Sequence, residues 1–231
     1  MGHAPACLVA ASQSGIAIAL LLVWGRVYPA GQRSHARPAG ANRGLMDREI
    51  VRMLVLSAMV QLGYDLFQFY LPIYGHSIGL SASAIGAVLA TLAIAAFVVR
   101  LFLARLLKLV PGRRLLAWVL LAGAIGFALV PYASDAIVLG AIAFLFGLGM
   151  GIGIPLTVIL MFANSADGRS GQTLGIRLTA NNLMRVAGPI VFGPIGSAMG
   201  FAAVFWIVAA ILGSGSLLAR ASRNAHGRPS E

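Results

Sequence analysis

Two sets of polar residues recur at helical spacing inside runs that are otherwise apolar. In the first set, Arg177, Asn181, Arg185 and Gly188 follow one another at intervals of four, four and three residues. Positions with this spacing share one face of a helix. A charge at the centre of a bilayer costs about 2.5–3.5 kcal/mol on the insertion scale. We therefore expect this face to lie against protein or water and not against lipid.

The second set is acidic and polar. It lies in the run VLSAMVQLGYDLFQFYLPIY and consists of Ser57, Gln61, Asp65, Gln68 and Pro72, with Tyr64 beside the acid. This spacing also predicts a single helix face. We expect the two faces to share a polar interior in which Asp65 pairs with Arg185. Two interpretations stay open: a water-filled pathway for a substrate or proton, and a structural ion pair that locks two helices. Gln61, Gln68, Asn181 and Asn182 extend the polarity beyond a single pair and favour the pathway.

The composition assigns the chain to the membrane. Of its 231 residues 59% are hydrophobic and only 10% are charged, where soluble domains carry about 25% charged residues. The net charge of +11 comes from short arginine clusters between apolar runs, which set membrane topology and give no basic domain for nucleic acid. The single Cys7 and four scattered histidines indicate no metal site, and no cofactor motif or catalytic constellation indicates an enzyme.

The apolar runs predict an all-α, polytopic membrane bundle of about seven transmembrane helices. These helices are expected at residues 8–28, 53–74, 84–107, 115–132, 136–162, within 175–200, and at 201–218. The corresponding regions are a first helix in 1–30, a basic cytoplasmic linker at 31–52, a six-helix unit at 53–219 and a tail at 220–231. Basic clusters follow the odd-numbered spans only, which predicts a cytoplasmic carboxyl terminus in a bacterial-type inner (plasma) membrane.

Glycine and proline mark two further segments. Gly140, Gly147, Gly151 and Pro155 lie along one face of the fifth span. They indicate either a bending segment that lets two helices rock or ordinary small-residue packing. The Gly188-Pro189 step in the sixth span is interpreted as a packing and bending point and not as a binding site.

Several local patterns resemble the carboxy-terminal half of a major facilitator superfamily transporter over about residues 8–220. FYLPIYGHSIGLSASAIGAVLA is similar to the turn between that half's first two helices, and GLGMGIGIPL resembles its glycine-rich fourth helix. GQTLGIRLTANNLMRVAGPIVFGPIGSAMGFAAVFW resembles its fifth helix running into its sixth. ARLLKLVPGRRLL resembles the family's basic loop motif, with Arg105, Arg113 and Arg114 retained and Lys108, Leu109 and Pro111 departing from it.

This resemblance implies alternating access by two six-helix halves that rock around a central site. It also implies that the face from Ser57 to Gln68 lines the cavity, that Gly147 and Gly151 lie opposite, and that Arg177 and Arg185 support it. The expected function is secondary transport of a small solute, with a proton as a further candidate. A family member has about twice as many spans, so we expect a larger assembly with a second half or a homodimer. The alternative is a truncated, transport-incompetent remnant or a helical scaffold.

Overall fold

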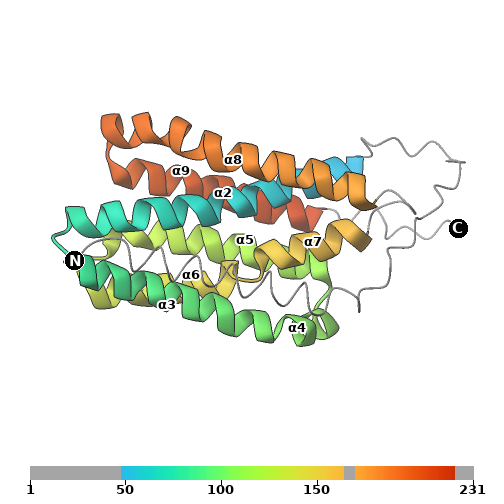
Figure 1. The fold of residues 1–231 in the computed structure, drawn as a ribbon, viewed down its shortest axis with the longest axis horizontal. Coiled ribbons are helices and arrows are strands. Elements are labelled where there is room, and N and C mark those ends of the chain that lie inside the picture. Colours follow the sequence, from blue (N-terminus) through green and yellow to red (C-terminus); the bar gives the residue numbers. More distant parts are fainter. Residues whose placement is uncertain (1–47, 164–169, 222–231) are drawn as a thin grey trace, which may run out of the picture. The chain divides into compact units, whose positions relative to one another are not determined.

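The structure is a computed structural model that describes residues 48–163 and 170–221. The regular elements of this part are all helical (Figure 1). They are α2 (Arg48–Ser77), α3 (Ala82–Leu101), α4 (Leu103–Leu109), α5 (Gly112–Leu129), η2 (Val130–Tyr132), α6 (Ala136–Met150), α7 (Gly153–Ala163), α8 (Ser170–Met199) and α9 (Phe201–Ala221). The predicted span at 8–28, most of the linker and most of the tail lie outside the described residues.

Five helical segments in the described ranges are long and apolar enough to cross a membrane. They are α2, α3, α5 with η2, α6 with α7, and α9. The sixth long helix, α8, has 30 residues and is therefore about 45 Å long. It is not among the five, and it carries two arginines and two asparagines within its length. An all-helical membrane bundle is therefore what the apolar pattern predicted.

Two helix ends differ from the bounds of the predicted segments. The third span ends at Leu101 and not at residue 107, because the chain turns at Phe102, whose N–H donates to the Val99 carbonyl at 3.1 Å. The first described helix begins at Arg48, inside the segment assigned to the linker, and places Glu49 in its first turn. At Phe102 the helix end depends on a local hydrogen bond that apolar periodicity does not encode.

The fifth predicted span is broken in two, between Met150 and Gly153 (Figure 1). The cause is Pro155, which has no N–H to donate to the carbonyl four residues earlier, that of Gly151. Arg100 of α3 donates its Nε–H to this carbonyl at 2.8 Å. The bending interpretation of this segment thus corresponds to a real interruption of the helix, with its freed carbonyl satisfied from a neighbouring helix.

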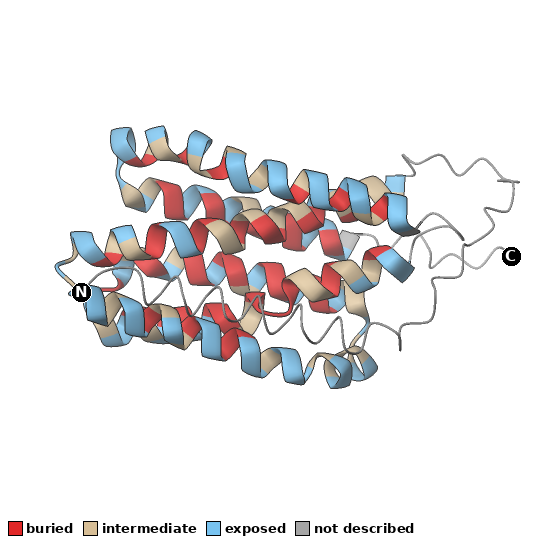
Figure 2. Ribbon diagram, viewed as in Figure 1, coloured by how far each residue is buried: buried red, intermediate tan, exposed pale blue. Residues whose placement is uncertain are grey.

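The core is built around α2, which contacts α3, α5, α6, α7, α8 and α9. The rings of Phe67 and Phe146 stack with their centroids 3.7 Å apart, and Phe127 meets Phe67 edge-on at 5.4 Å. Figure 2 shows buried positions along α2 and α5, whereas α8 is mostly exposed or intermediate. Its buried residues form a single stripe, namely Thr173, Arg177, Asn181, Gly188, Phe192 and Gly196.

The glycines of α6 serve close packing against α3. A Cβ on Gly147 would lie 2.5 Å from the Leu92 carbonyl oxygen, and one on Gly151 would lie 2.6 Å from the Ala96 Cα. These two glycines therefore face α3, and their expected position opposite the Ser57–Gln68 face was wrong. Gly140 has more space, because its nearest neighbour would be the Val88 Cγ2 at 4.0 Å.

Gly147→Ala should destabilise the bundle by about 1–3 kcal/mol, since the added methyl overlaps main-chain atoms that cannot move aside cheaply. Gly140→Ala is the matched control on the same helix and should be neutral or slightly stabilising. Thermal unfolding of both variants in detergent checks this. Equal melting temperatures for the two would contradict the packing derived for Gly147.

Candidate functional site

The Asp65 carboxylate joins α2 to α8 near the middle of both helices. The Arg185 Nε lies 3.2 Å from Oδ2 and its Nη2 lies 3.5 Å from Oδ1. Gln61, one turn earlier on α2, donates its Nε2 to Oδ2 at 2.9 Å. The predicted pairing of Asp65 with Arg185 is therefore present. The Asp65 side chain is 19% exposed, whereas the Arg185 side chain is 63% exposed, so the pair opens onto the outer surface of α8.

A second contact between the same helices lies nearer their amino-terminal ends. The Ser57 hydroxyl donates to Asn181 Oδ1 at 3.3 Å, and both residues are buried. Because residue numbers increase in the same direction along both helices from one contact to the other, α2 and α8 run parallel. Their polar faces thus meet at two levels, as the two periodic patterns predicted.

Arg177 is directed to a different neighbour. Its residue is only 3% exposed, and its Nη2 donates to Thr157 Oγ1 at 2.9 Å and to the Ile154 carbonyl at 3.3 Å, both on α7. The Thr157 hydroxyl donates in turn to the Ile154 carbonyl at 2.8 Å. Arg177 Nε is buried without a hydrogen-bond partner. The two arginines of one helix face therefore have different surroundings: one is paired with an acid and the other with neutral oxygens.

Two of the predicted site residues stay outside this network. Tyr64 is half-buried and packs against the hydrophobic core, and Gln68 is exposed. Neither side chain makes a hydrogen bond to another described residue. Gly188, by contrast, lies in the α2–α8 contact, where a Cβ would be 3.0 Å from Leu62 Cδ1. The helix continues through Pro189 and Pro194.

Comparison with known proteins fits these elements to a single family. A model of the Major Facilitator Superfamily matches residues 53–230, which include nearly all of α2 and every later element. The chain belongs to the Major Facilitator Superfamily. No curated protein matches it. Members of this family are membrane transporters and not enzymes, so the family assigns this integral membrane chain to the transport of a small solute. The extent of the match is consistent with one half of the family's fold.

The segment that resembles the family's basic loop motif lies at the end of the bundle where α2 begins. Arg113 of α5 pairs with Glu49 of α2, and the Arg105 guanidinium lies 5.8 Å from the centroid of the Phe102 ring. Arg114 is exposed. Close by in the sequence, Arg52 donates to the carbonyl of Leu218 and so ties α2 to α9. Two of the three motif arginines thus contact a side chain at this end.

Sequence reasoning missed several residues of this transporter half. Glu49, Arg52, Arg100 and Thr157 make contacts between helices, yet none belongs to a polar stripe within its own span. The one available signal was Pro155, which implies an orphaned carbonyl at Gly151 and so a donor from elsewhere. The identity of that donor depends on which helices are neighbours.

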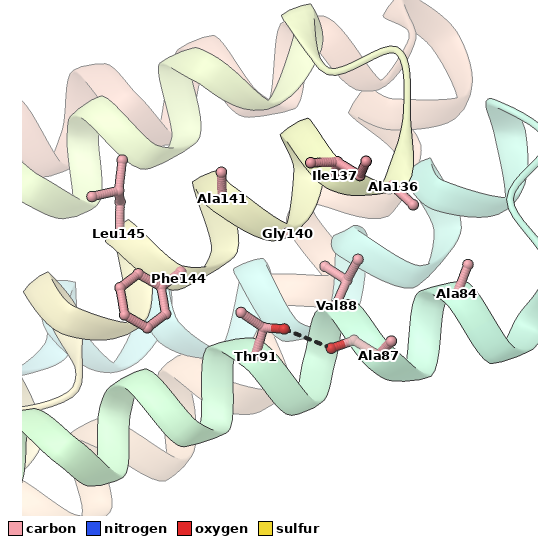
Figure 3. Close-up of a pocket in the computed structure, with 10 residues that line it drawn as sticks. All are labelled: Ala84, Ala87, Val88, Thr91, Ala136, Ile137, Gly140, Ala141, Phe144 and Leu145. Atoms are coloured by element: carbon pink, nitrogen blue, oxygen red, sulfur yellow. Dashed lines mark hydrogen bonds between the residues drawn. The ribbon is translucent and has the colours of Figure 1, made fainter.

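A separate pocket lies between α3 and α6 (Figure 3). Its volume is about 760 Å³, and its lining is apolar apart from Thr91, whose hydroxyl is already donated to the Ala87 carbonyl at 2.9 Å. Phe144, Leu145 and Ile137 line the α6 side. This pocket offers no ionisable group to a solute, so the polar α2–α7–α8 region is the better candidate site for the transporter.

Thr157→Val should lower the stability of the transporter half by about 1–3 kcal/mol, because it removes the buried hydroxyl that accepts from Arg177. Thr91→Val is the matched control, since that hydroxyl satisfies only a carbonyl of its own helix. Chemical or thermal unfolding in detergent micelles measures the difference. An equal effect of the two substitutions would show that the Arg177–Thr157 contact contributes nothing to stability.

Proposed function

We propose that this chain moves a small solute across the membrane by alternating access, as one half of a larger or dimeric assembly. The observation that carries the proposal is the Asp65–Arg185 pair, in which the arginine side chain is 63% exposed at the surface of the bundle. Arg185 lies about 20 Å from either end of α8, taking 1.5 Å per residue. The hydrocarbon core extends only about 15 Å to either side of its centre.

A guanidinium at this depth requires protein or water beside it. Asn182 and Thr179 are also exposed on α8, and Gln68 is exposed on α2. Polar groups facing lipid in the hydrocarbon region carry a free-energy cost that apolar neighbours avoid. A second bundle that encloses a polar interior against this surface would remove that cost. Its source would be another copy of the chain or a separate transporter half.

The ion pair is suited to take part in coupling. Protonation of Asp65 would remove its negative charge and release Arg185, whereas a solute bearing a charge would compete with one partner of the pair. Gln61 would hold the carboxylate in place through its hydrogen bond. The break between α6 and α7 supplies the element that would bend as the assembly opens and closes.

The direction of the chain follows from its charge pattern. Arg100, Arg105, Lys108, Arg113 and Arg114 cluster around the α3–α5 connection, whereas the α2–α3 and α8–α9 connections carry no lysine or arginine. By the positive-inside rule this pattern supports a cytoplasmic carboxyl terminus. The same arrangement would suit a bacterial-type inner membrane.

Uptake by proteoliposomes tests this function, with a panel of small anionic, cationic and neutral solutes and the chain alone or with a second half. Asp65→Asn and Arg185→Gln should each lower uptake about tenfold or more, because each leaves the other member of the pair without its charge partner. The double variant Asp65→Asn/Arg185→Gln separates the two interpretations of the pair. If uptake stays low in the double variant, the result supports the pathway.

Full recovery of uptake in the double variant would contradict a role in the pathway and reduce the pair to a structural lock. A folded assembly that takes up none of the solutes would favour a transport-incompetent scaffold. Arg220→Gln removes a positive charge from the exposed end of α9 and serves as the charge-matched control.

A further inference from the structure

The two arginines on α8 differ in what neutralises them. Arg185 pairs with Asp65. Arg177 contacts only a hydroxyl and a main-chain carbonyl, and no carboxylate of the described residues reaches it. We propose that Arg177 is a binding site for a carboxylate group of the solute, so that the transported substrates are organic anions. Transport of these anions rests on the function proposed above, whereas their binding at Arg177 does not.

Arg177 has unused hydrogen-bonding capacity. A guanidinium has five N–H donors. Both contacts of Arg177 use Nη2, and the Nε–H is buried without an acceptor. The residue is only 3% exposed, so bulk water does not supply the missing partner. A buried donor without an acceptor costs free energy that a ligand oxygen would recover.

The acidic and basic residues of the described interior are unequal in number. Along the described part of the chain, α2, α7 and α8 contact one another, and away from their ends they carry one acidic and two basic residues. These are Asp65, Arg177 and Arg185. Since Asp65 and Arg185 compensate each other, Arg177 is the basic residue that no acidic residue of these described segments balances. An uncompensated buried charge is unfavourable, so the site attracts one negative charge and repels a cation.

The geometry and charge of a carboxylate suit Arg177. The planar fork of a guanidinium matches a carboxylate, which can accept from two of its nitrogens. One carboxylate balances the single uncompensated charge, whereas a phosphate monoester, with a charge near −2 at neutral pH, would leave an excess. Asn181, one helical turn after Arg177 on α8, and its hydrogen-bond partner Ser57 on α2 are both buried and supply neutral polar groups.

A bound carboxylate would displace contacts that Arg177 makes with α7. Arg177 connects α8 to α7 through Thr157 and Ile154, and a carboxylate is a stronger acceptor for a guanidinium than a hydroxyl or an amide carbonyl. A bound carboxylate would therefore replace these contacts and loosen α7 from α8. Because α7 follows the break at Gly151, it can move without α6. Solute binding would thus be coupled to movement of the half-helix beside the site.

Equilibrium binding to the full chain in lipid nanodiscs tests the site without requiring transport. The probes are radiolabelled acetate and benzoate, with radiolabelled choline as the cationic counterpart, all at constant ionic strength. We expect saturable binding of at least one of the carboxylates and none of choline. Arg177→Gln should weaken the carboxylate affinity about tenfold or more, the loss expected for a charged hydrogen bond. Arg220→Gln removes the same charge at an exposed position and should leave the affinity unchanged.

Arg177→Lys keeps the charge but removes the Nε–H and the planar fork, and it serves if Arg177→Gln does not fold. It should weaken binding by an intermediate factor. Absence of saturable binding of both carboxylates, binding of choline, or unchanged affinity in both Arg177 variants would overturn the proposal.

The outcomes distinguish this site from the proposed function. Uptake of a cation or a neutral solute that depends on Asp65 and is unaffected by Arg177→Lys would overturn the carboxylate site and leave transport standing. Saturable, Arg177-dependent carboxylate binding by an assembly that moves no solute would support the site and overturn the proposed transport.

Discussion

The rest of the bundle depends on the cost of a charged group in hydrocarbon. Arg185 lies at the centre of a helix long enough to cross the bilayer, and its nearest compensation is Asp65 on α2. The pair neutralises the charge but leaves the arginine side chain largely exposed at the surface of this single bundle. The surface of α8 is therefore polar where lipid would demand apolar side chains. This one conflict explains why α8 differs from the other long helices, and it connects the family assignment to the proposed assembly.

The helices that hold the pair are packed by different means along their lengths. Toward its amino-terminal end α8 is seated by polar contacts, through Asn181 with Ser57 and Arg177 with Thr157. Toward its carboxyl end it is seated by Gly188, Phe192 and Gly196, which are buried. The break between α6 and α7 lies beside the polar portion, and its freed carbonyl is held by Arg100. The polar contacts can exchange partners while the glycine contacts stay, so movement is expected at the end that holds Arg177.

Periodicity predicted the faces of the helices well because a stripe of polar residues in an apolar run has few physical explanations. The pairing of Asp65 with Arg185 was one of the possibilities that these faces allowed, because Arg177 lies on the same face of its helix, and the structure contains it. Periodicity could not show that Arg177 would contact α7, or that Arg100 would donate to the carbonyl that Pro155 leaves without a partner. It also could not show that Tyr64 and Gln68 would lie outside the network. Those facts depend on which helices are neighbours and on how each is rotated. Gly147 illustrates the limit: its small size indicated a close contact, but its partner was α3.

In the membrane, the α8 face beside Arg185 is expected to meet protein or water. Nitroxide labels on Val186 and Ile125, introduced as single cysteines in a Cys7→Ser background, test it through collisions with lipid-soluble oxygen and with a water-soluble nickel chelate. The two side chains are 62% and 51% exposed in the isolated chain, so lipid alone would reach them about equally. We expect high oxygen accessibility at Ile125 on α5 and clearly lower oxygen accessibility at Val186. Equal, high oxygen accessibility at both positions would contradict it.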